Sequence, residues 1–383
     1  MRPPHPPFLR AVALALLGAA FGCASEPPVK QVGVLDGREP TVRVYLRSLD
    51  PWTETTLAGK GGLRVKSAAG DVARPHPVAL ARSGEKGLRI DGAEPVTAAT
   101  FAPMEGSFTL AGKHGFSGTL EWRDGKLVNH VTMENYVLGV LRGELPVRGV
   151  APDAAGAQAI AVRSYTLHYL ARNERDFDLD DTTLFQRYVG LRPAPEDDHL
   201  RAGVRATTGL YLAYDGVPLK AYYHSTCGGH TTDAPTGLNR DGLRPMKGVH
   251  CEFCRDTRYW RWEATLKDDE VVKAAALTGR LRSVEVVERG PGERASRVRV
   301  TTDAGERAMH ANDFRLAVGP SALRSTNILG IERAADGITV RGGGWGHGVG
   351  LCQLGAMGMA KRGHQPERIA GYYYLCAPVK SAY

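Results

Sequence analysis

The apolar positions that follow residue 133 recur at a helical spacing. They lie on one face of a helix, at Val137, Val140 and Leu141. Glu144 is the next position on the same stripe, and Pro146 disfavours helical geometry in the residue before it. The pattern therefore predicts a helix that ends at Glu144 or just past it, with a carboxyl group on its buried side.

A second helix is predicted directly after the first. Pro152 suits the first turn of a helix, and a run of small residues favours helix and close packing: Ala154, Ala155, Ala157, Ala159 and Ala161. Glu144 is thus expected where two helices meet, and burial there raises the pKa of a carboxyl group. The alternative is a structural role, in which Glu144 caps the helix end or pairs with Arg142 or Arg163.

Alternating apolar and polar residues predict strands around this helical pair. The N-terminal part contains three such runs, at 41–46, 63–65 and 119–122. Later in the chain, 204–214 and 218–224 predict a hairpin around Asp215-Gly216. Further strands are expected at 296–300 and 338–340, and helices at 268–277 and 351–361. The predicted fold class is α+β, with a mixed, β-rich catalytic domain at 128–383 that contains the helical pair and a small β-rich appendage at 41–127.

The first 23 residues are typical of an export signal. Arg2 and Arg10 supply a positive region before a short apolar core at 11–21, and Gly22-Cys23 resembles the end of a bacterial lipobox. We expect a lipid anchor on Cys23; simple cleavage near Ala24 is the alternative. Either route places the mature protein outside the cytoplasm, in the cell envelope, with 24–40 as a polar tether.

Composition narrows the possible partners. Of the 383 residues, 43% are hydrophobic and 23% charged, as in ordinary globular proteins. The net charge is +8, but no run of Lys and Arg stands out, so nucleic-acid binding is not expected. A basic exported protein can instead meet an anionic polymer such as the cell wall.

The cysteines suggest a metal site. Cys251 and Cys254 are two residues apart, a spacing that suits tetrahedral zinc, and Cys227 lies in the segment HSTCGGH. The predicted ligands of a structural zinc are Cys227, His230, Cys251 and Cys254. Disulfides are the alternative because exported thiols usually oxidise, although five cysteines follow Cys23, so at least one stays unpaired or binds metal.

A glycine cluster, GGGWGHGVGLCQ at 342–353, is the second candidate for chemistry. Its glycines permit backbone geometry that other residues cannot reach and let a ligand approach the main chain. Trp345 offers a flat face for a sugar ring, and His347 offers a proton donor or acceptor. The spacing fits neither a dinucleotide nor a phosphate loop. The alternative is a turn that contains a packed tryptophan.

Several blocks of the chain together resemble the SpoIID/LytB family of peptidoglycan enzymes and amidase modifiers. They are ENYVLGVLRGELP with AQAIAVRSYTL, then TGLYLAYDGVPLKAYYHSTCGGHT, then LRSTNI and GGGWGHGVGLCQLGA, in order over residues 134–360. Three features depart from the family pattern. Cys352 replaces a small polar residue and is expected to pack inside, Leu354 replaces a frequent Trp, and the C-terminal segment differs from the usual ending.

The resemblance implies a lytic transglycosylase. Such an enzyme cuts the bond between N-acetylmuramic acid and N-acetylglucosamine in strands stripped of stem peptides and leaves 1,6-anhydro ends. The resemblance makes Glu144 the acid and base. It also implies, together with the glycine cluster, the substrate-binding residues Arg163, Tyr165, His224, Ser225, Trp345, His347 and Gln353. Arg163 has a structural ion pair as its alternative. The implied partners are glycan strands and a cell-wall amidase; some members carry zinc. The other hypotheses are a non-catalytic wall-binding protein that stimulates an amidase, and a zinc-stabilised binding module.

Overall fold

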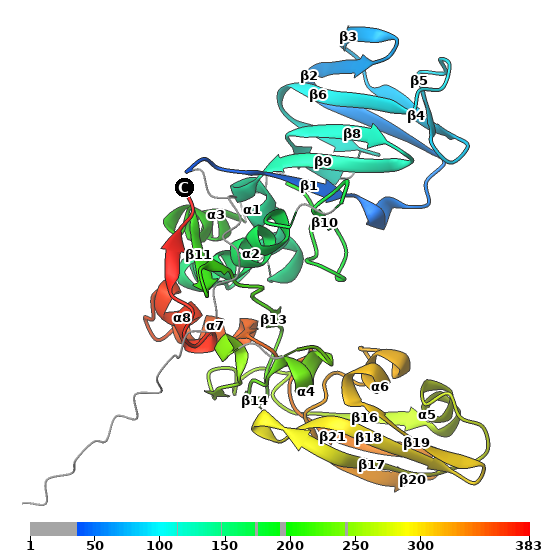
Figure 1. Cartoon of the computed structure of the whole chain (residues 1–383), viewed down its shortest axis with the longest axis vertical. Helices are drawn as coiled ribbons and strands as arrows, with labels where there is room; N and C mark the ends of the chain where they lie inside the picture. The colour runs from blue at the N-terminus through cyan, green and yellow to red at the C-terminus, as the bar shows by residue number, and fades with distance from the viewer. Residues whose placement is uncertain (1–36, 113, 147, 173–174, 192–196, 242–243) are drawn as a thin grey trace, which may run out of the picture.

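The computed structural model describes residues 37–383 except 113, 147, 173–174, 192–196 and 242–243. The predicted export signal with Cys23, and the tether up to residue 36, lie outside the described residues. The fold class is α+β, as predicted. Three bodies follow one another along the long axis: an N-terminal sheet, a central helical body and a second β-rich lobe (Figure 1). Among the described helices, none has both the length and the apolar character to cross a bilayer.

The N-terminal body is a ten-stranded sheet. Its strands are β1 (Thr41–Tyr45), β2 (Glu54–Ser67), β3 (Gly70–Arg74), β4 (Val78–Ser83), β5 (Gly87–Ile90), β6 (Ala98–Leu110), β7 (His114–Ser117), β8 (Thr119–Arg123), β9 (Lys126–Thr132) and β10 (Leu179–Asp180). The main order is β10-β1-β9-β8-β6-β2-β4-β5, and only the β1–β10 pair is parallel among its described pairings. The three predicted runs fall in β1, β2 and β8. The expected domain boundary at residue 127 falls inside β9, which continues the sheet to the first helix.

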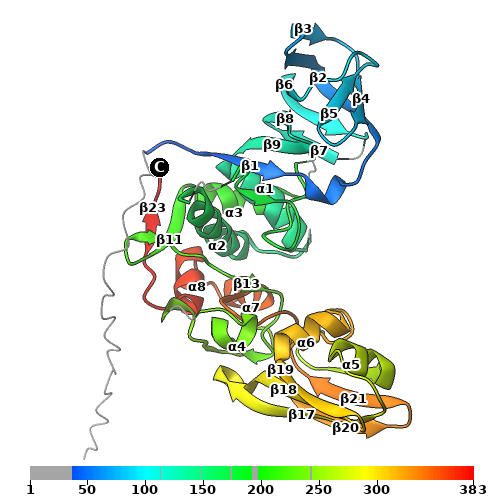
Figure 2. The ribbon, with the colours of Figure 1, turned by 45° about the vertical axis from the view of Figure 1, so that its right-hand side comes forward.

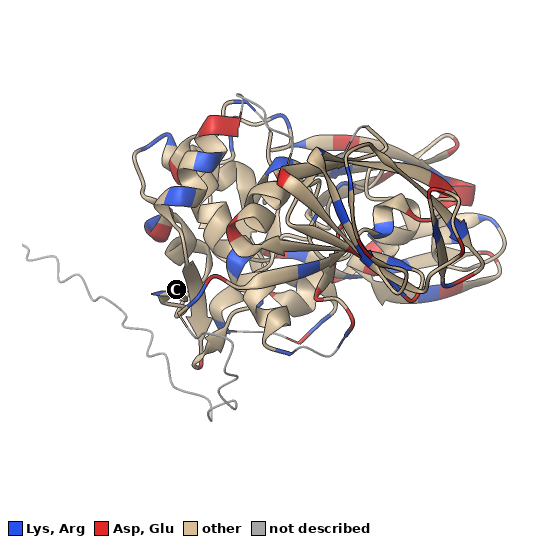
Figure 3. Ribbon diagram, turned by 90° about the horizontal axis from the view of Figure 1, so that it is seen from above, with Lys and Arg blue, Asp and Glu red and all other residues tan. Residues whose placement is uncertain are grey.

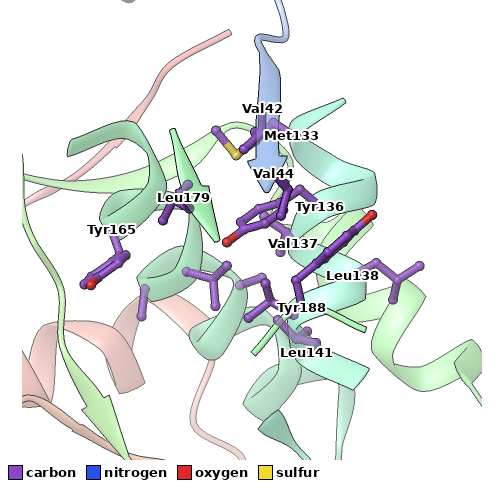
Figure 4. Packing of buried hydrophobic residues seen from close by; sticks show 14 of the residues in the cluster. Val42, Val44, Met133, Tyr136, Val137, Leu138, Leu141, Tyr165, Leu179 and Tyr188 are labelled. Atoms are coloured by element: carbon purple, nitrogen blue, oxygen red, sulfur yellow. The ribbon is translucent and has the colours of Figure 1, made fainter. Parts of the chain in front are cut away.

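The two predicted helices are present. Helix α1 (Met133–Glu144) ends at Glu144, and α2 (Pro152–Leu170) begins at Pro152, whose fixed φ suits a first turn. The apolar face of α1 packs against β1 and the segment around Tyr188, and the rings of Tyr136 and Tyr188 are stacked 5.1 Å apart (Figure 4). Every residue of α2 from Ala154 to Leu167 is buried, so this helix forms the centre of the body.

The rest of the central body comes from distant parts of the chain. It contains α3 (Asp198–Ala206), β11 (Leu210–Tyr214), β12 (Val217–Pro218), β13 (Tyr223–His224), β14 (Gly229–His230), α4 (Ala234–Leu238), β15 (His250–Cys251), β22 (Leu351–Cys352), α7 (Gln353–Ala360), α8 (Pro366–Tyr373) and β23 (Val379–Ser381). The hairpin turn at Asp215-Gly216 joins β11 to β12. However, 204–206 belongs to α3 rather than to a strand, and β13 pairs in parallel with β22 rather than with β11.

The second β-rich lobe has its own hydrophobic core. It comprises β16 (Trp262–Lys267), α5 (Asp268–Ala274), β17 (Leu281–Gly290), β18 (Arg294–Thr302), β19 (Gly305–His310), α6 (Ala311–Val318), β20 (Ile328–Ala334) and β21 (Gly337–Gly342). The two three-stranded sheets are β16-β21-β20 and β17-β18-β19. Figure 2 shows α5 and α6 on the side of the lobe that faces the central body. This lobe and the helical pair were expected to form one domain, whereas they have separate hydrophobic cores.

Basic and acidic residues are interspersed over the visible ribbon (Figure 3). The net charge of +8 is therefore not concentrated in one long basic surface in this view.

Candidate active site and cysteine cluster

Glu144 lies at the last position of α1, where the segment 186–190 crosses the helix. Two glycines permit this crossing. A Cβ at Gly143 would lie 2.2 Å from the carbonyl oxygen of Arg187, and one at Gly139 would lie 2.4 Å from the ring of Tyr188. Because the backbones approach so closely, the N–H of Arg187 donates a hydrogen bond of 3.0 Å to Oε1 of Glu144.

The pKa of Glu144 is raised. Burial is the largest cause, and it outweighs the Arg187 N–H and the Gln353 amide, which favour the ionised form. Neither arginine that was considered as an ion-pair partner of Glu144 pairs with it. Arg142 pairs with Asp197 at 3.0 Å, and Arg163 pairs with Glu134. The carboxyl group therefore keeps its proton to a higher pH than an exposed glutamate does.

A cleft of about 310 Å³ opens beside this carboxyl group. Its aromatic walls come from Tyr165, Tyr169, Phe185, Tyr222 and Tyr223, and the remaining lining residues are Glu144, Thr183, Leu184, Lys220, Leu238, Arg240 and His347. Glu144 is the single carboxylate among the described lining residues. Aromatic walls with a few polar groups are typical of clefts that bind small ligands.

His347 brings the glycine cluster into the cleft. Its Nδ1 accepts a hydrogen bond of 3.1 Å from the N–H of Val349, which leaves the proton on Nε2. Burial, aided by Arg315 and Arg294, lowers the pKa of His347 to about 3. His347 is therefore neutral at physiological pH.

His224 lies behind His347, with the ring centroids 5.6 Å apart. It is 4% exposed, its Nδ1 lies 3.2 Å from the carbonyl oxygen of Val349, and its Nε2 has no hydrogen-bond partner within the described part of the chain. Ser225 does not line the cleft; its carbonyl oxygen accepts the N–H of Leu354 at 3.0 Å. These two predicted residues support the loop from behind.

Gln353, the first residue of α7, lies beside Glu144. Gln353 is 7% exposed, and its Nε2 is near enough to Glu144 to favour the carboxylate but makes no hydrogen bond of normal geometry to any described group. An amide donor that is buried and unpaired is costly unless something binds it. Gln353 and Glu144 therefore offer adjacent polar groups to a ligand in the cleft.

Trp345 and Arg163 occupy positions other than those expected. Trp345 is absent from the cleft lining and packs edge-on against Tyr259 at 4.6 Å, as in the alternative of a turn with a packed tryptophan. Arg163 is fully buried and binds Glu134 through contacts of 2.7 and 2.9 Å. Its Nη1 also donates to the carbonyl oxygen of Leu210 at 2.6 Å. Arg163 is a structural ion-pair residue, which corrects the expected contact with substrate.

Most of the aromatic wall of the cleft was not predicted from the sequence. Tyr165 was expected, but Tyr169, Phe185, Tyr222 and Tyr223 were not. Two signals were available: Tyr169 follows Tyr165 by four residues on one helix face, and Tyr222-Tyr223 directly precede His224.

Four buried cysteines meet next to the cleft: Cys227, Cys251, Cys254 and Cys352. Their sulfur atoms all lie within 4.8 Å of one another, and all four are free thiols. The sulfurs of Cys227 and Cys254 are 3.4 Å apart, too far for a disulfide. Cys352 takes the fourth position, where His230 was expected; the Nδ1 of His230 contacts the carbonyl of Thr231 instead.

The donor set fits a metal ion. Four thiolates in a compact buried group suit tetrahedral zinc or iron. Two of the sulfurs accept hydrogen bonds from backbone N–H groups. The sulfur of Cys352 accepts from the N–H groups of Cys227 and Gly355, each at 3.2 Å. The sulfur of Cys227 accepts from the N–H of Gly229 at 3.4 Å. Such donors stabilise thiolates. The pKa of Cys254 is lowered, chiefly by the thiol of Cys227. The cluster is thus a candidate metal site, and Cys352 places it one residue from Gln353.

Two segments of the chain match known protein families. Residues 123–214, from β8 to β11, match the family described as SpoIID, stage II sporulation protein. The chain contains a SpoIID family domain. This SpoIID domain includes Glu144 and Tyr165, whereas the glycine cluster lies beyond it. Residues 250–350 match a domain of unknown function, DUF8618, which covers the second lobe and Trp345 and His347.

Curated relatives share more of the chain than the SpoIID domain alone. The chain is 28% identical over 258 residues to an uncharacterised protein of Brachyspira hyodysenteriae, covering 65% of this chain and 66% of that protein. It is 28% identical over 269 residues to stage II sporulation protein D of Bacillus subtilis, covering 67% and 76%. It is also 24% identical over 285 residues to the amidase enhancer of the same organism, covering 62% and 39%. These relatives are distant homologues of the chain.

Proposed function

We propose that the protein is a lytic transglycosylase that cleaves the bond between N-acetylmuramic acid and N-acetylglucosamine in glycan strands. The observation that carries this proposal is the half-buried Glu144, whose pKa is raised by burial, in a cleft with aromatic walls. The proposal extends the SpoIID domain match to a specific reaction.

One carboxyl group suffices for this reaction. Protonated Glu144 gives its proton to the bridging oxygen while the bond from that oxygen to C1 of the muramyl sugar breaks. The resulting carboxylate then takes the proton of the C6 hydroxyl as O6 bonds to C1, which closes the 1,6-anhydro ring and restores the acid. A hydrolase with two catalytic carboxylates would need a second acid across the bond, and Glu144 is the single one in the described lining.

The neighbouring groups have separate tasks. The N–H of Arg187 holds Oε1 of Glu144 and leaves Oε2 for the substrate. The Nε2 of Gln353 donates to a sugar oxygen near the acid. Neutral His347 forms part of the cleft wall beside it. The tyrosines of the cleft stack against sugar rings.

The cysteine cluster holds the metal in this proposal. Cys227, Cys251, Cys254 and Cys352 bind one zinc ion, which cross-links segments that are distant in sequence and fixes the start of α7. We also propose, from the signal-like residues 1–23, that the protein is exported and lipid-anchored at Cys23 on a membrane face, next to its substrate.

A second function is favoured by one comparison. The similarity to the amidase enhancer supports a non-catalytic role, in which the cleft binds glycan and the protein stimulates a cell-wall amidase. In that case Glu144 would be a binding residue.

A digest separates the two functions. Purified protein is incubated with glycan strands that lack stem peptides, and the products are analysed by mass spectrometry. If the protein is catalytic, the rate of 1,6-anhydro-end formation falls by about 10²–10⁴-fold in Glu144→Gln. The rate is unchanged in Glu367→Gln, because Glu367 is an exposed residue of α8. Absence of anhydro products at every pH and metal condition would refute catalysis and leave the amidase role.

A further inference from the structure

A second hollow continues the cleft away from Glu144. Its volume is about 230 Å³, and it shares Tyr169, Lys220 and Arg240 with the catalytic cleft. The other lining residues are Arg172, Arg175, Phe177 and Asp178. A ligand that fills the cleft and extends past Lys220 therefore enters a hollow lined by four cationic side chains.

Among the described lining residues of this hollow, the single carboxylate is already engaged. Asp178 accepts the backbone N–H of Arg43 at 2.7 Å, and its Oδ1 lies 2.8 Å from the Arg43 guanidinium. By contrast, Arg172, Arg175, Lys220 and Arg240 form no salt bridge with any described residue. Four cations around one hollow without an anionic partner repel one another. An anion that binds there relieves this repulsion.

Two of these cations are held in place. The ammonium of Lys220 lies 5.0 Å from the ring centroid of Tyr169 and 5.4 Å from that of Tyr222, at cation–π distances. The guanidinium of Arg175 lies 5.6 Å from the ring of Phe185, and its carbonyl oxygen accepts Arg43 Nη2 at 3.1 Å. Both anchoring rings, Tyr169 and Phe185, also line the catalytic cleft.

The pKa values of two side chains near the hollow also reflect its positive charge. The pKa of His168 is lowered to about 4, chiefly by burial and also by the charges of Arg172 and Lys220. Burial alone would raise the pKa of the Tyr169 hydroxyl, but Lys220 leads the interactions that bring it below its usual value. Neighbouring groups thus respond to an excess of positive charge.

We propose that this hollow is a carboxylate-binding subsite for the glycan strand, next to the sugar whose glycosidic oxygen Glu144 protonates. The inference rests on the proposed function, because it takes the strand in the cleft as given. Guanidinium groups bind carboxylates through paired, charge-assisted hydrogen bonds. Peptidoglycan offers carboxylates from two sources: the lactyl group of N-acetylmuramic acid where the peptide is removed, and the stem peptide where it remains.

Binding measurements test the subsite. Dissociation constants are measured by calorimetry in the Glu144→Gln background, so that no ligand is consumed. Three strands of equal length are compared: strands with free lactyl carboxylates, the same strands with those carboxylates converted to methylamides, and strands with stem peptides. We expect at least one carboxylate-bearing strand to bind about ten times more tightly than the methylamide strand.

The variant Arg172→Gln/Arg175→Gln is expected to remove this preference. The matched control is Lys361→Gln/Arg368→Gln, which removes the same charge from exposed positions outside the hollow. Preference for the free lactyl strand assigns the lactyl group, and preference for the peptide-bearing strand assigns the stem peptide. Equal affinity for all three strands, or equal loss in both double variants, would overturn the subsite.

The digest described above keeps the two proposals separable. A carboxylate preference that depends on Arg172 and Arg175, together with a digest that yields no anhydro ends, would retain the subsite and refute catalysis. Anhydro products without any such preference would refute the subsite and retain catalysis.

Discussion

The backbone of Arg187 meets Glu144 and Gly143 at the same crossing. Its N–H donates to Oε1 of Glu144 over 3.0 Å, and its carbonyl oxygen occupies the space that a Cβ on Gly143 would enter, 2.2 Å away. The position of the proposed acid therefore depends on the absence of a side chain one residue before it.

The substitution Gly143→Ala tests this dependence. The added methyl group pushes the segment of Arg187 outward and breaks its hydrogen bond to Glu144, so we expect the rate of anhydro-end formation to fall about tenfold to a hundredfold. Gly371→Ala is the matched control, because a Cβ there has no neighbour within 4 Å. The measurements are the digest and thermal unfolding. Full activity in a folded Gly143→Ala protein would contradict the positioning role.

The pH dependence of turnover follows from the raised pKa of Glu144. The acid form is the active form at the start of the cycle, so kcat is expected to decline as pH rises through a value above the usual 4.5. His347, with a pKa of about 3, stays neutral and adds no limb above pH 5. A pH–rate profile of the digest checks this. An activity that rises with pH from 5 to 8 would contradict Glu144 as the proton donor.

The same raised pKa has a consequence for stability. The folded state disfavours ionised Glu144 relative to the unfolded chain, so stability is lost as pH rises through the folded pKa. Glu144→Gln removes this loss and keeps an oxygen for the Arg187 N–H. We expect the variant to be more stable than the native protein by about 0.5–2 kcal/mol at neutral pH and nearly equal below pH 4. Denaturant unfolding at several pH values measures this, with Glu367→Gln as the unchanged control.

The buried pair of Arg163 and Glu134 gives a prediction of a different kind. Arg163→Met leaves the carboxylate of Glu134 without its partner and is expected to cost about 3–5 kcal/mol, whereas adding Glu134→Gln recovers part of this loss. Glycan affinity of the folded variant is expected to be unchanged. A variant of native stability that no longer binds glycan would restore the substrate-binding role.

Local signals account for what the sequence predicted well. The stripe that ends at Glu144, the break imposed by Pro146 and the first turn at Pro152 all act within a few residues, so α1 and α2 were predictable with their meeting point. Arg163 was ambiguous because its partner Glu134 lies 29 residues earlier, in another helix. The aromatic wall was hidden for the same reason, since Tyr169, Phe185 and Tyr222 converge only in the folded chain.

The division of the chain into separate hydrophobic cores also depends on tertiary contacts. The strands at 296–300 and 338–340 were visible as alternating runs, but alternation does not reveal which core a strand joins. The second lobe has a separate core. One fully buried residue of that lobe, Arg294, nevertheless reaches the central body, where its Nη2 donates to the carbonyl oxygen of Cys227 at 2.9 Å.

The last prediction concerns the fourth proposed metal ligand, which is Cys352 rather than His230. Cys352 precedes Gln353 and is 98 residues from Cys254 (352 − 254), so no spacing rule connects it to the CxxC pair. Cys352→Ser is expected to lose bound zinc and to lower the free energy of unfolding by about 4 kcal/mol when zinc is at a thousand times its dissociation constant. His230→Ala is expected to keep both. Metal analysis and thermal unfolding of the two variants, with and without a chelator, measure the difference. Zinc retained by Cys352→Ser and lost from His230→Ala would reverse the assignment, because the ion would then be held by the histidine that the structure places outside the cluster.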